Sequence, residues 1–326
     1  MIISFYSIEL TLESVITNWV SLFAANTYNS MGSFTLELQN TEENSNLVKL
    51  WKYCTIDNDN ENVYVITSAN VTAGKIVLTG FPATYILKFR ASTEVIAKTQ
   101  AEEAMLTLVS NMTGWKNIVV NEPTEISAFF GNQISDKQII EYLQGIGQAT
   151  DVGFRFRKAG RSLVFECYKP PINNRVKYST SLKNVTNLDY LISENEYYNC
   201  AIVAGAGEGS KRVTVTVSIG SPAGTELREL YVDAKNEQPE ETETAEEYKE
   251  RLRLIGLQKL SEQLKTETLS FSVGNDDDVK LGDIINVSLD EFGITVQVRV
   301  TEEQILNQKN VTTRTICVGT PLKIIR

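Results

Sequence analysis

Apolar and polar residues alternate in several short stretches near the start of the chain. Phe34, Leu36 and Leu38 are separated by polar residues, and the stretch 75–79 has the same alternation. A period of two places successive side chains on opposite faces of a β-strand, so a strand with one buried face gives this pattern. Residues 1–95 are therefore predicted to form a compact antiparallel β domain, within which the stretch 12–23 could form a short helix.

Between about residues 96 and 178 the apolar residues take the spacing of a helix. The first predicted helix carries Ala101, Met105, Leu108 and Met112, with Gly114 placed to end it. A second is predicted to begin at Ser135 and to carry Ile139, Leu143 and Ile146. Serine before a helix and glycine after it are favoured at helix ends. Because a predicted hairpin at 154–168 follows, this region is interpreted as a mixed α/β domain.

Alternation returns in the last part of the chain, residues 179–326. It is carried by Val213, Val215, Val217 and Ile219, and by the stretches 269–273, 284–289 and 294–300. A charged helix is predicted at about 240–267, where Thr244 and Glu247 have the spacing of a capping box. The predicted fold class is therefore α+β and rich in strands, with two related β domains flanking an α/β domain and one helix inserted in the second.

The 326 residues include no histidine. Without imidazole the chain has no Ser-His-Asp triad, no Cys-His pair and no histidine-containing zinc or haem site, which excludes most hydrolytic mechanisms. The 41 acidic residues outnumber the 31 basic ones, and the formal charge of −10 disfavours sequence-independent binding to nucleic acid or anionic lipid.

The four cysteines are far apart in the sequence and form no CxxC pair: Cys54, Cys167, Cys200 and Cys317. A zinc knuckle and a thioredoxin-type motif are thereby excluded, and buried free thiols are expected. The first residues lack the basic region and the long apolar stretch of a signal peptide, and no stretch approaches the roughly 18 apolar residues of a membrane helix. We therefore expect synthesis in a cytosol.

One glycine-rich motif invites interpretation as a nucleotide loop. Gly205, Gly207 and Gly209 follow an apolar, strand-like stretch. A phosphate loop needs a helix directly after the glycines, whereas the stretch 211–219 is predicted to be a strand. A flexible hairpin is therefore favoured over a phosphate site.

Two acidic motifs resemble cation-binding loops. Asp57–Glu61 has carboxylates at alternate positions, but Asn62 and Ser68 stand where an EF-hand loop has glycine and glutamate, so a hairpin tip is favoured. Asn275–Asp278 is predicted to be a turn, at which a weak metal site at Asp276–Asp278 stays open.

Two carboxylates at a suitable distance are enough for a glycoside hydrolase, so the missing histidine does not exclude that class. Nothing in the sequence selects one pair among the acidic residues. Trp19, Trp51 and Trp115, with the 13 tyrosines, could line a sugar groove, but scattered aromatic residues in β-rich proteins usually belong to cores or interfaces. No catalytic, cofactor-binding or metal-binding residue is therefore predicted.

The order of several motifs resembles that in siphophage tail-hub proteins, also called tail-associated or baseplate hub proteins. The motifs are Tyr28–Leu38, Leu47–Cys54, Leu78–Phe81, Leu87–Arg90, the helix predicted within 93–112, Ile139–Phe156, Tyr198–Gly205 and Leu281–Ile285. Each is weak by itself, and their shared order and spacing over nearly the whole chain carry the resemblance.

The resemblance implies two barrel-like antiparallel β domains of the tube type. They would be residues 1–95 and residues 179–326, interrupted by the helix at about 240–267, with residues 96–178 as a peripheral α/β domain. Three subunits would then present six similar barrels to a six-fold tail tube. The implied assembly is a homotrimer at the distal end of the tail of a phage, a prophage particle or a related particle.

The resemblance also implies the partners and the function. The ring would join the distal tail protein or the tail tube to a fibre, spike or receptor-binding protein. It would form part of the channel for DNA, and an acidic lumen would repel the phosphates. This function needs no cofactor, no membrane and no enzymatic activity. Because the sequence stops at Arg326, after the last predicted strand, any wall-degrading activity is expected in another chain.

Two other functions stay open. A carbohydrate- or receptor-binding tail-tip module would have affinity for glycans as an isolated protein. A cell-wall glycoside hydrolase with a carboxylate pair would release soluble sugar from purified cell walls, and one Asp or Glu substitution would abolish the release.

Overall fold

The computed structural model describes residues 1–96, 99–112, 114, 116–130, 134–240, 243–263, 266–274, 277–308, 311–319 and 323–325. The chain divides into two compact units. Unit 1 comprises Met1–Asp189 and Leu269–Arg326, and unit 2 comprises Tyr190–Thr268. The chain leaves unit 1 within β16 (Thr186–Ser193) and returns within β20 (Thr266–Val273). The predicted division at residues 95 and 178 stays a prediction.

The N-terminal part of unit 1 is an antiparallel sheet. Its strands are β1 (Ile3–Tyr6), β2 (Leu12–Ile16), β3 (Ser21–Thr27), β4 (Ser33–Gln39), β5 (Tyr53–Ile56), β6 (Tyr64–Val71) and β7 (Lys75–Pro82). Their order across the sheet is β3-β4-β7-β6-β5-β1-β2. The strands predicted around Leu36 and at 75–79 are confirmed. A one-turn helix, α1 (Glu42–Ser45), lies between β4 and β5.

The short helix considered at residues 12–23 is wrong, because these residues form β2 and the start of β3. Ile16 pairs with Ile3, and Leu22 pairs with Leu36 across the sheet. Strand pairing therefore buries these apolar side chains against apolar neighbours, which outweighs the helical spacing in the sequence.

The middle of unit 1 is mixed, as predicted. Its longer elements are the 3₁₀ helix η1 (Ala83–Phe89), α2 (Ala101–Ser110), α3 (Ile139–Thr150), β10 (Ile118–Val120), β13 (Gly153–Ala159) and β14 (Ser162–Tyr168). Four two-residue strands are β8 (Ala91–Ser92), β9 (Thr99–Gln100), β11 (Phe129–Phe130) and β12 (Lys137–Gln138). The hairpin β13–β14 and both helices are confirmed, and their apolar residues share one core.

The second helix does not begin at Ser135. Lys137 and Gln138 pair with β8 as β12, so their backbone is extended and α3 begins only at Ile139. The first helix ends at Ser110, and Gly114 lies beyond it with a φ of 82°.

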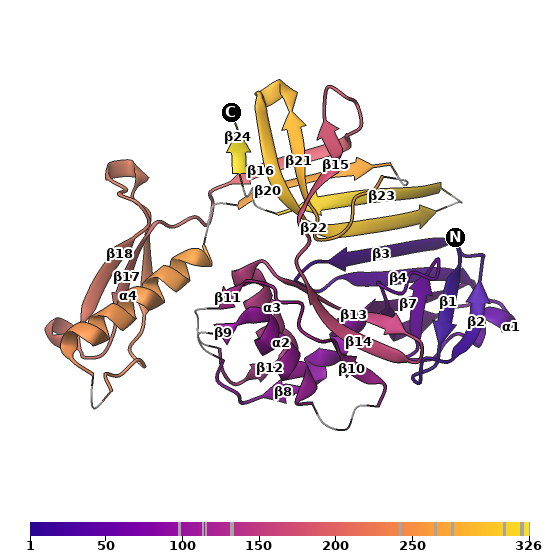
Figure 1. Cartoon of the computed structure of the whole chain (residues 1–326), viewed down its shortest axis with the longest axis horizontal. Coiled ribbons are helices and arrows are strands. Elements are labelled where there is room, and N and C mark those ends of the chain that lie inside the picture. The colour runs from indigo at the N-terminus through magenta and orange to yellow at the C-terminus, as the bar shows by residue number, and fades with distance from the viewer. Residues whose placement is uncertain are drawn as a thin grey trace. The chain divides into compact units, whose positions relative to one another are not determined.

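The last strands of unit 1 extend the N-terminal sheet. They are β15 (Ile172–Ser179), β21 (Ile284–Leu289), β22 (Ile294–Gln308), β23 (Val311–Val318) and β24 (Lys323–Ile325), with the short η4 (Asp290–Phe292) before β22. The long β22 lies alongside β3 (Figure 1), and the two strands pair antiparallel. The sheet is therefore continuous through β20-β23-β22-β3-β4. It branches at β22, which also pairs with β21 and β24, and β21 pairs with β15.

Unit 2 is a small sheet with one helix on it. Its elements are β17 (Cys200–Ala204), β18 (Thr214–Ser218), β19 (Glu229–Asp233), α4 (Ala245–Ser261) and the short η2 (Gly209–Lys211) and η3 (Gly224–Glu226). The strand order is β18-β17-β19, and α4 lies along this sheet (Figure 1). The helix predicted at 240–267 therefore exists, but it packs on three strands of its own unit.

The capping box of α4 is confirmed. The Thr244 side chain accepts the N–H of Glu247, and the Glu247 carboxylate accepts the N–H of Thr244. Close contact between α4 and the sheet depends on Gly256, where a Cβ would lie 2.6 Å from Val217 Cγ1. In the part of the chain that the structure describes, no helix combines the length and apolar character needed to cross a bilayer.

Candidate functional site

The joint between the N-terminal and C-terminal strands of unit 1 lies at β3 and β22. Seven residue pairs form it, from Thr27 opposite Glu302 to Ser21 opposite Gln308. Side chains of directly opposed residues lie on the same face of a sheet. Each face of this sheet therefore runs without interruption from the N-terminal strands to the C-terminal ones.

One face of this joint is buried. It is apolar toward the N-terminal strands, and at the joint itself it also carries the polar residues Asn26, Glu303 and Asn307. Leu22 lies opposite Leu36, which lies opposite Leu78, and all three are fully buried. Ala24, also fully buried, lies opposite Ile305 of β22. At roughly 25 cal/mol for each Å² of apolar surface removed from water, burial of this face stabilises the sheet.

The other face, here called the polar face, is half-buried or exposed except at Ala25. By register it carries Ser21, Phe23, Ala25, Thr27, Ser33, Thr35, Glu37, Gln39, Lys75, Val77, Thr79, Glu302, Gln304, Leu306, Gln308, Val311, Thr313, Thr315 and Cys317. The polar face carries few charged side chains, and these have partners. Glu37 pairs with Lys75 at 3.2 Å, and Glu302 accepts a hydrogen bond from Gln304. The polar face is therefore rich in uncharged Ser, Thr and Gln.

Two contacts besides strand pairing hold the joint. Trp19 Nε1 donates to Asn307 Oδ1 at 2.8 Å, across a sequence separation of 288 residues. The backbone N–H of Tyr28 donates to Thr301 O at 2.9 Å. Trp19 therefore belongs to this joint, whereas Trp51 is 40 % exposed and Trp115 lies outside the described residues.

A buried arginine fastens the end of the joint to the α/β region. Arg299 of β22 is only 3 % exposed and donates to both carboxylate oxygens of Asp151, at 2.6 and 2.5 Å. It also donates to the backbone oxygens of Gly282 and Pro170. A bidentate pair fixes the orientation of both groups, so Asp151, the C-cap of α3, is held against β22.

The ring of Tyr28 fills the space beneath this arginine. The guanidinium carbon of Arg299 lies 5.1 Å from the ring centroid, and the hydroxyl donates to the backbone oxygens of Asp151 and Tyr168. Burial raises the pKa of the Tyr28 phenol, which keeps it a neutral donor. A Cβ on Gly153 would lie 2.2 Å from Tyr28 Cε2, so only glycine fits there.

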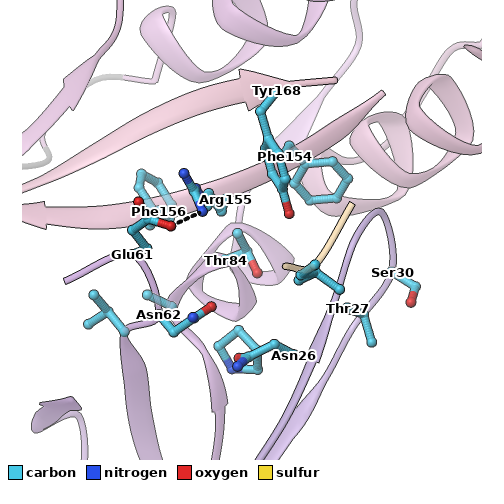
Figure 2. Close-up of a pocket in the computed structure, with 14 residues that line it drawn as sticks. Asn26, Thr27, Ser30, Glu61, Asn62, Thr84, Phe154, Arg155, Phe156 and Tyr168 are labelled. Carbon is cyan, nitrogen blue, oxygen red and sulfur yellow. Dashed lines mark hydrogen bonds and ion pairs between the residues drawn. The ribbon is translucent and has the colours of Figure 1, made fainter. Parts of the chain in front are cut away.

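A small polar cavity adjoins Tyr168 (Figure 2). Figure 2 shows Arg155 joined to Glu61 on one side of it, with Asn26 and Thr27 on the other. Three buried atoms that line it have no hydrogen-bond partner among the described residues: Asn26 Nδ2, Thr27 Oγ1 and Tyr168 OH. The volume of about 20 Å³ suits a single water molecule and is too small for a sugar or nucleotide.

The glycine-rich motif is the connection between β17 and β18, which pair antiparallel. The hairpin interpretation is confirmed. A Cβ on Gly205 would lie 2.4 Å from the hydroxyl of Tyr248, which accepts the N–H of Ala206. Gly205 therefore admits α4 close to the sheet.

The acidic motif at 57–61 is the turn between β5 and β6, and its carboxylates bond to groups both inside and outside the turn. Asp57 Oδ1 accepts the N–H of Ile2, and Asp59 accepts those of Glu61 and the Asn62 side chain. Asp57 and Asn58 both have left-handed backbone, which Asp and Asn tolerate well.

The turn at 275–278 lies partly outside the described residues, since Asn275 and Asp276 are among those not described. Asp277 accepts hydrogen bonds from Gly274 N and Tyr178 OH, and Asp278 pairs with Arg175 at 3.2 Å. No group of three or more Cys, Asp or Glu side chains within the described ranges is arranged to hold a metal ion.

The cysteines are free thiols. Cys54, Cys167 and Cys200 are buried, and Cys317 on β23 is half-buried. Burial raises the pKa of the Cys317 thiol to about 11, so this group stays protonated at neutral pH.

Comparison with known proteins assigns the family. The model of the family described as siphovirus ReqiPepy6 Gp37-like protein matches residues 3–320. The chain belongs to this Gp37-like family. The resemblance found in the sequence is thereby confirmed at the level of siphovirus tail proteins, and no curated protein sequence matches the chain.

The fold of this Gp37-like protein is that of solved phage tail proteins. The 43 kDa tail protein of prophage MuSo2 from Shewanella oneidensis superposes with a TM-score of 0.63 at 14% identity, covering 98% of each chain. The tail protein from Neisseria meningitidis MC58 gives 0.61 at 14% identity, covering 98% of this chain and 96% of that one. Prophage tail protein gp18 from Listeria monocytogenes EGD-e gives 0.56 at 14% identity, covering 98% and 94%.

Sequence reasoning missed the residues that hold the joint. Arg299 lies within an alternating stretch and looks like any strand residue, and Asp151 looks like an ordinary loop acid. The one available signal was glycine at positions 153 and 282, both of which lie against the Tyr28 ring.

Proposed function

We propose that this protein is a structural tail-hub subunit that forms a ring at the distal end of a phage tail or a related particle. The observation that carries the proposal is the continuous sheet through β3 and β22. It gives one chain two sheet modules, side by side, with a shared polar face. The family membership and the fold of phage tail proteins support the same function.

Three copies of such a chain would present six similar modules. A six-fold tail tube can be matched by three subunits only if each subunit contributes two related surfaces. In this proposal the modules are the N-terminal strands and the C-terminal strands of unit 1, each curving toward a barrel. The homotrimer would mate with the distal tail protein or tube on one side and with a fibre, spike or receptor-binding protein on the other.

The polar face is proposed to line the DNA channel. Its charged residues in the described parts of β3, β4, β7, β22 and β23 are Glu37, Lys75 and Glu302, a net charge of −1 from two acids and one base. Uncharged Ser, Thr and Gln with a slight excess of carboxylate give phosphates no strong site, so DNA would slide past. The net charge of the chain led us to expect an acidic lumen, and we propose a lumen that is only slightly acidic.

The proposed function is non-enzymatic. The polar cavity beside Tyr168 has room for one water molecule. The described carboxylates of both acidic motifs are engaged within the chain, by turn backbone and by groups such as Arg155, Arg175 and Tyr178. A carbohydrate-binding tail-tip module remains the second candidate, supported by the exposed aromatic residues Trp51 and Phe89.

Electron microscopy of the full chain mixed with the tail proteins encoded beside it tests the proposal. The expected result is a three-fold ring with six sheet modules and the polar face toward its axis. A matched variant, Leu22→Asp, places a carboxylate on the buried face and should abolish the ring, whereas Thr216→Asp on exposed β18 should leave it intact. A ring with the apolar face or the α/β region toward the axis would contradict the proposal, as would glycan binding by the isolated chain without any ring.

A further inference from the structure

A second surface of unit 1 is a wide, open apolar pocket. Its volume is about 760 Å³, within the range of roughly 300–1,000 Å³ of pockets that hold ligands. The turn between β1 and β2 contributes Ile8 and Leu10, the approach to β5 contributes Trp51, η1 contributes Phe89, and β10 contributes Ile118. We refer to it as the Trp51 pocket.

Large apolar side chains of the Trp51 pocket are exposed. Ile8 is 67 % exposed, Phe89 57 % and Trp51 40 %. The Trp51 and Phe89 rings meet edge to face at 5.5 Å, and Phe89 in turn meets Tyr85, so the rings form a fixed wall. A contiguous exposed apolar wall beside a pocket is typical of a surface that a partner covers.

The backbone under this wall is strained. Leu10 and Trp51 have left-handed φ values of 57° and 62°. Every other described non-glycine residue with a left-handed φ is an Asn, Asp, Glu or Lys. Bulky apolar residues rarely adopt this conformation, and strained residues persist where the surrounding structure fixes them, most often at functional sites.

Two cations flank the apolar wall. Lys116 and Arg161 line the pocket, are exposed, and have no ion-pair partner among the residues that the structure describes. Their loops are adjacent, because Leu163 N donates to Asn117 O at 2.8 Å. Among the residues that the structure describes, the one carboxylate that lines the pocket is Glu9, in the turn between β1 and β2. The pocket is therefore net positive on a chain of net charge −10.

We propose that the Trp51 pocket binds an acidic, apolar peptide segment of another protein of the same particle. An aliphatic or aromatic side chain of the segment would pack on Trp51 and Phe89, and its carboxylates would pair with Lys116 and Arg161. A neutral glycan fits less well, since it would leave the charges of Lys116 and Arg161 uncompensated, whereas an acidic segment would pair with both. The inference rests on the proposed function only for the source of the partner.

Fluorescence anisotropy with the full chain tests this proposal. The probes are two labelled peptides, one of alternating leucine and glutamate and one of alternating leucine and lysine. The acidic peptide should bind at least tenfold more tightly. Arg161→Glu should remove that preference, while the control Lys211→Glu, the same charge change in unit 2, should leave it unchanged. Phe89→Ala should lower the affinity for the acidic peptide at least fivefold.

Several results would overturn the proposal. The first is equal affinity for the two peptides. The second is an equal change of peptide preference in Arg161→Glu and Lys211→Glu. The third is displacement of the acidic peptide by a cell-wall oligosaccharide. Self-association of the chain that is lost in Arg161→Glu, measured by sedimentation, would assign the pocket to a second copy instead. If the chain prefers the acidic peptide but forms no three-fold ring, the pocket inference holds and the proposed ring is rejected. If the chain forms the ring but shows no preference between the peptides, the ring proposal holds and the pocket inference is rejected.

Discussion

At the scale of single residues, one buried cation decides how the joint is held. All three guanidinium nitrogens of Arg299 donate hydrogen bonds, to Asp151 and to two backbone oxygens, and the group lies over the Tyr28 ring. Removing a charge from water is costly unless every donor finds a partner. The stability of this region therefore depends on all the contacts of the Arg299 guanidinium together rather than on any one of them.

Removal of the Arg299 side chain is predicted to destabilise the folded protein. Arg299→Ala should lower the free energy of unfolding by about 2 kcal/mol, because the half-exposed Asp151 loses its bidentate partner and the backbone oxygens of Gly282 and Pro170 lose their donor. Urea denaturation measures the loss. The control is Arg175→Ala, whose pair with Asp278 is exposed and should be worth about 0–1 kcal/mol. Equal losses for the two variants would show that the buried pair has no special weight.

A methyl group beside Tyr28 is also predicted to destabilise the fold. Gly153→Ala places a Cβ 2.2 Å from the Tyr28 ring, so the ring or the strand must shift at a cost of about 1–3 kcal/mol. Gly74→Ala is the matched control, since a Cβ there meets no atom within 4 Å. Thermal unfolding should separate the two variants clearly, and an unchanged melting temperature for Gly153→Ala would contradict the packing argument.

At the scale of elements, sequence patterns predicted strands well wherever one face was buried. The strand around Phe34, the hairpin after α3 and the capping box of α4 follow from local residues. The stretch 12–23 failed, because helical spacing and strand pairing compete there and only the partners β1 and β4 decide. The same holds for α3, whose start is set by pairing of β12 with β8.

The pairing of β3 with β22 could not be predicted for a related reason. The contact joins residues nearly the whole chain apart, and no local pattern states which edge strand will find which partner. The roles of Arg299 and Asp151 could not be predicted for the same reason, because each residue has its role only through its contact with the other. The resemblance predicted the family but not these contacts.

One turn element is predicted to respond to acid. Asp290 accepts hydrogen bonds from Ser179 Oγ and from the N–H of Ser181, which lower its pKa from 3.8 to about 2. Because the folded pKa is the lower one, this stabilisation is present above about pH 4 and is lost as the pH falls towards 2. Asp290→Asn should therefore reduce stability at pH 6 and have little effect at pH 2. A loss that is the same at both pH values would contradict this account.

At the scale of the whole molecule, the polar face links the fold to the proposed channel. Thr79 and Gln304 lie on it, on opposite sides of the joint. Particles carrying Thr79→Lys together with Gln304→Lys should release DNA more slowly, because the added cations would hold phosphates. The delay should shrink as salt is raised, since counterions screen the attraction.

The control for that experiment lies in unit 2. Thr216→Lys adds a cation on the exposed strand β18 and should leave the release rate unchanged. If both sets of particles release DNA at the wild-type rate while still assembling, the polar face does not contact DNA and the channel proposal fails.

The β3–β22 joint has a consequence for biosynthesis. When a ribosome has made β3, the edge that pairs with β22 has no partner, because β22 begins only at Ile294. Unpaired edges invite association with other chains, so the nascent protein carries this hazard through almost its entire translation. Ribosome-bound chains truncated before β22 should therefore be protease-sensitive around β3, and protection should appear only once the final strands have emerged.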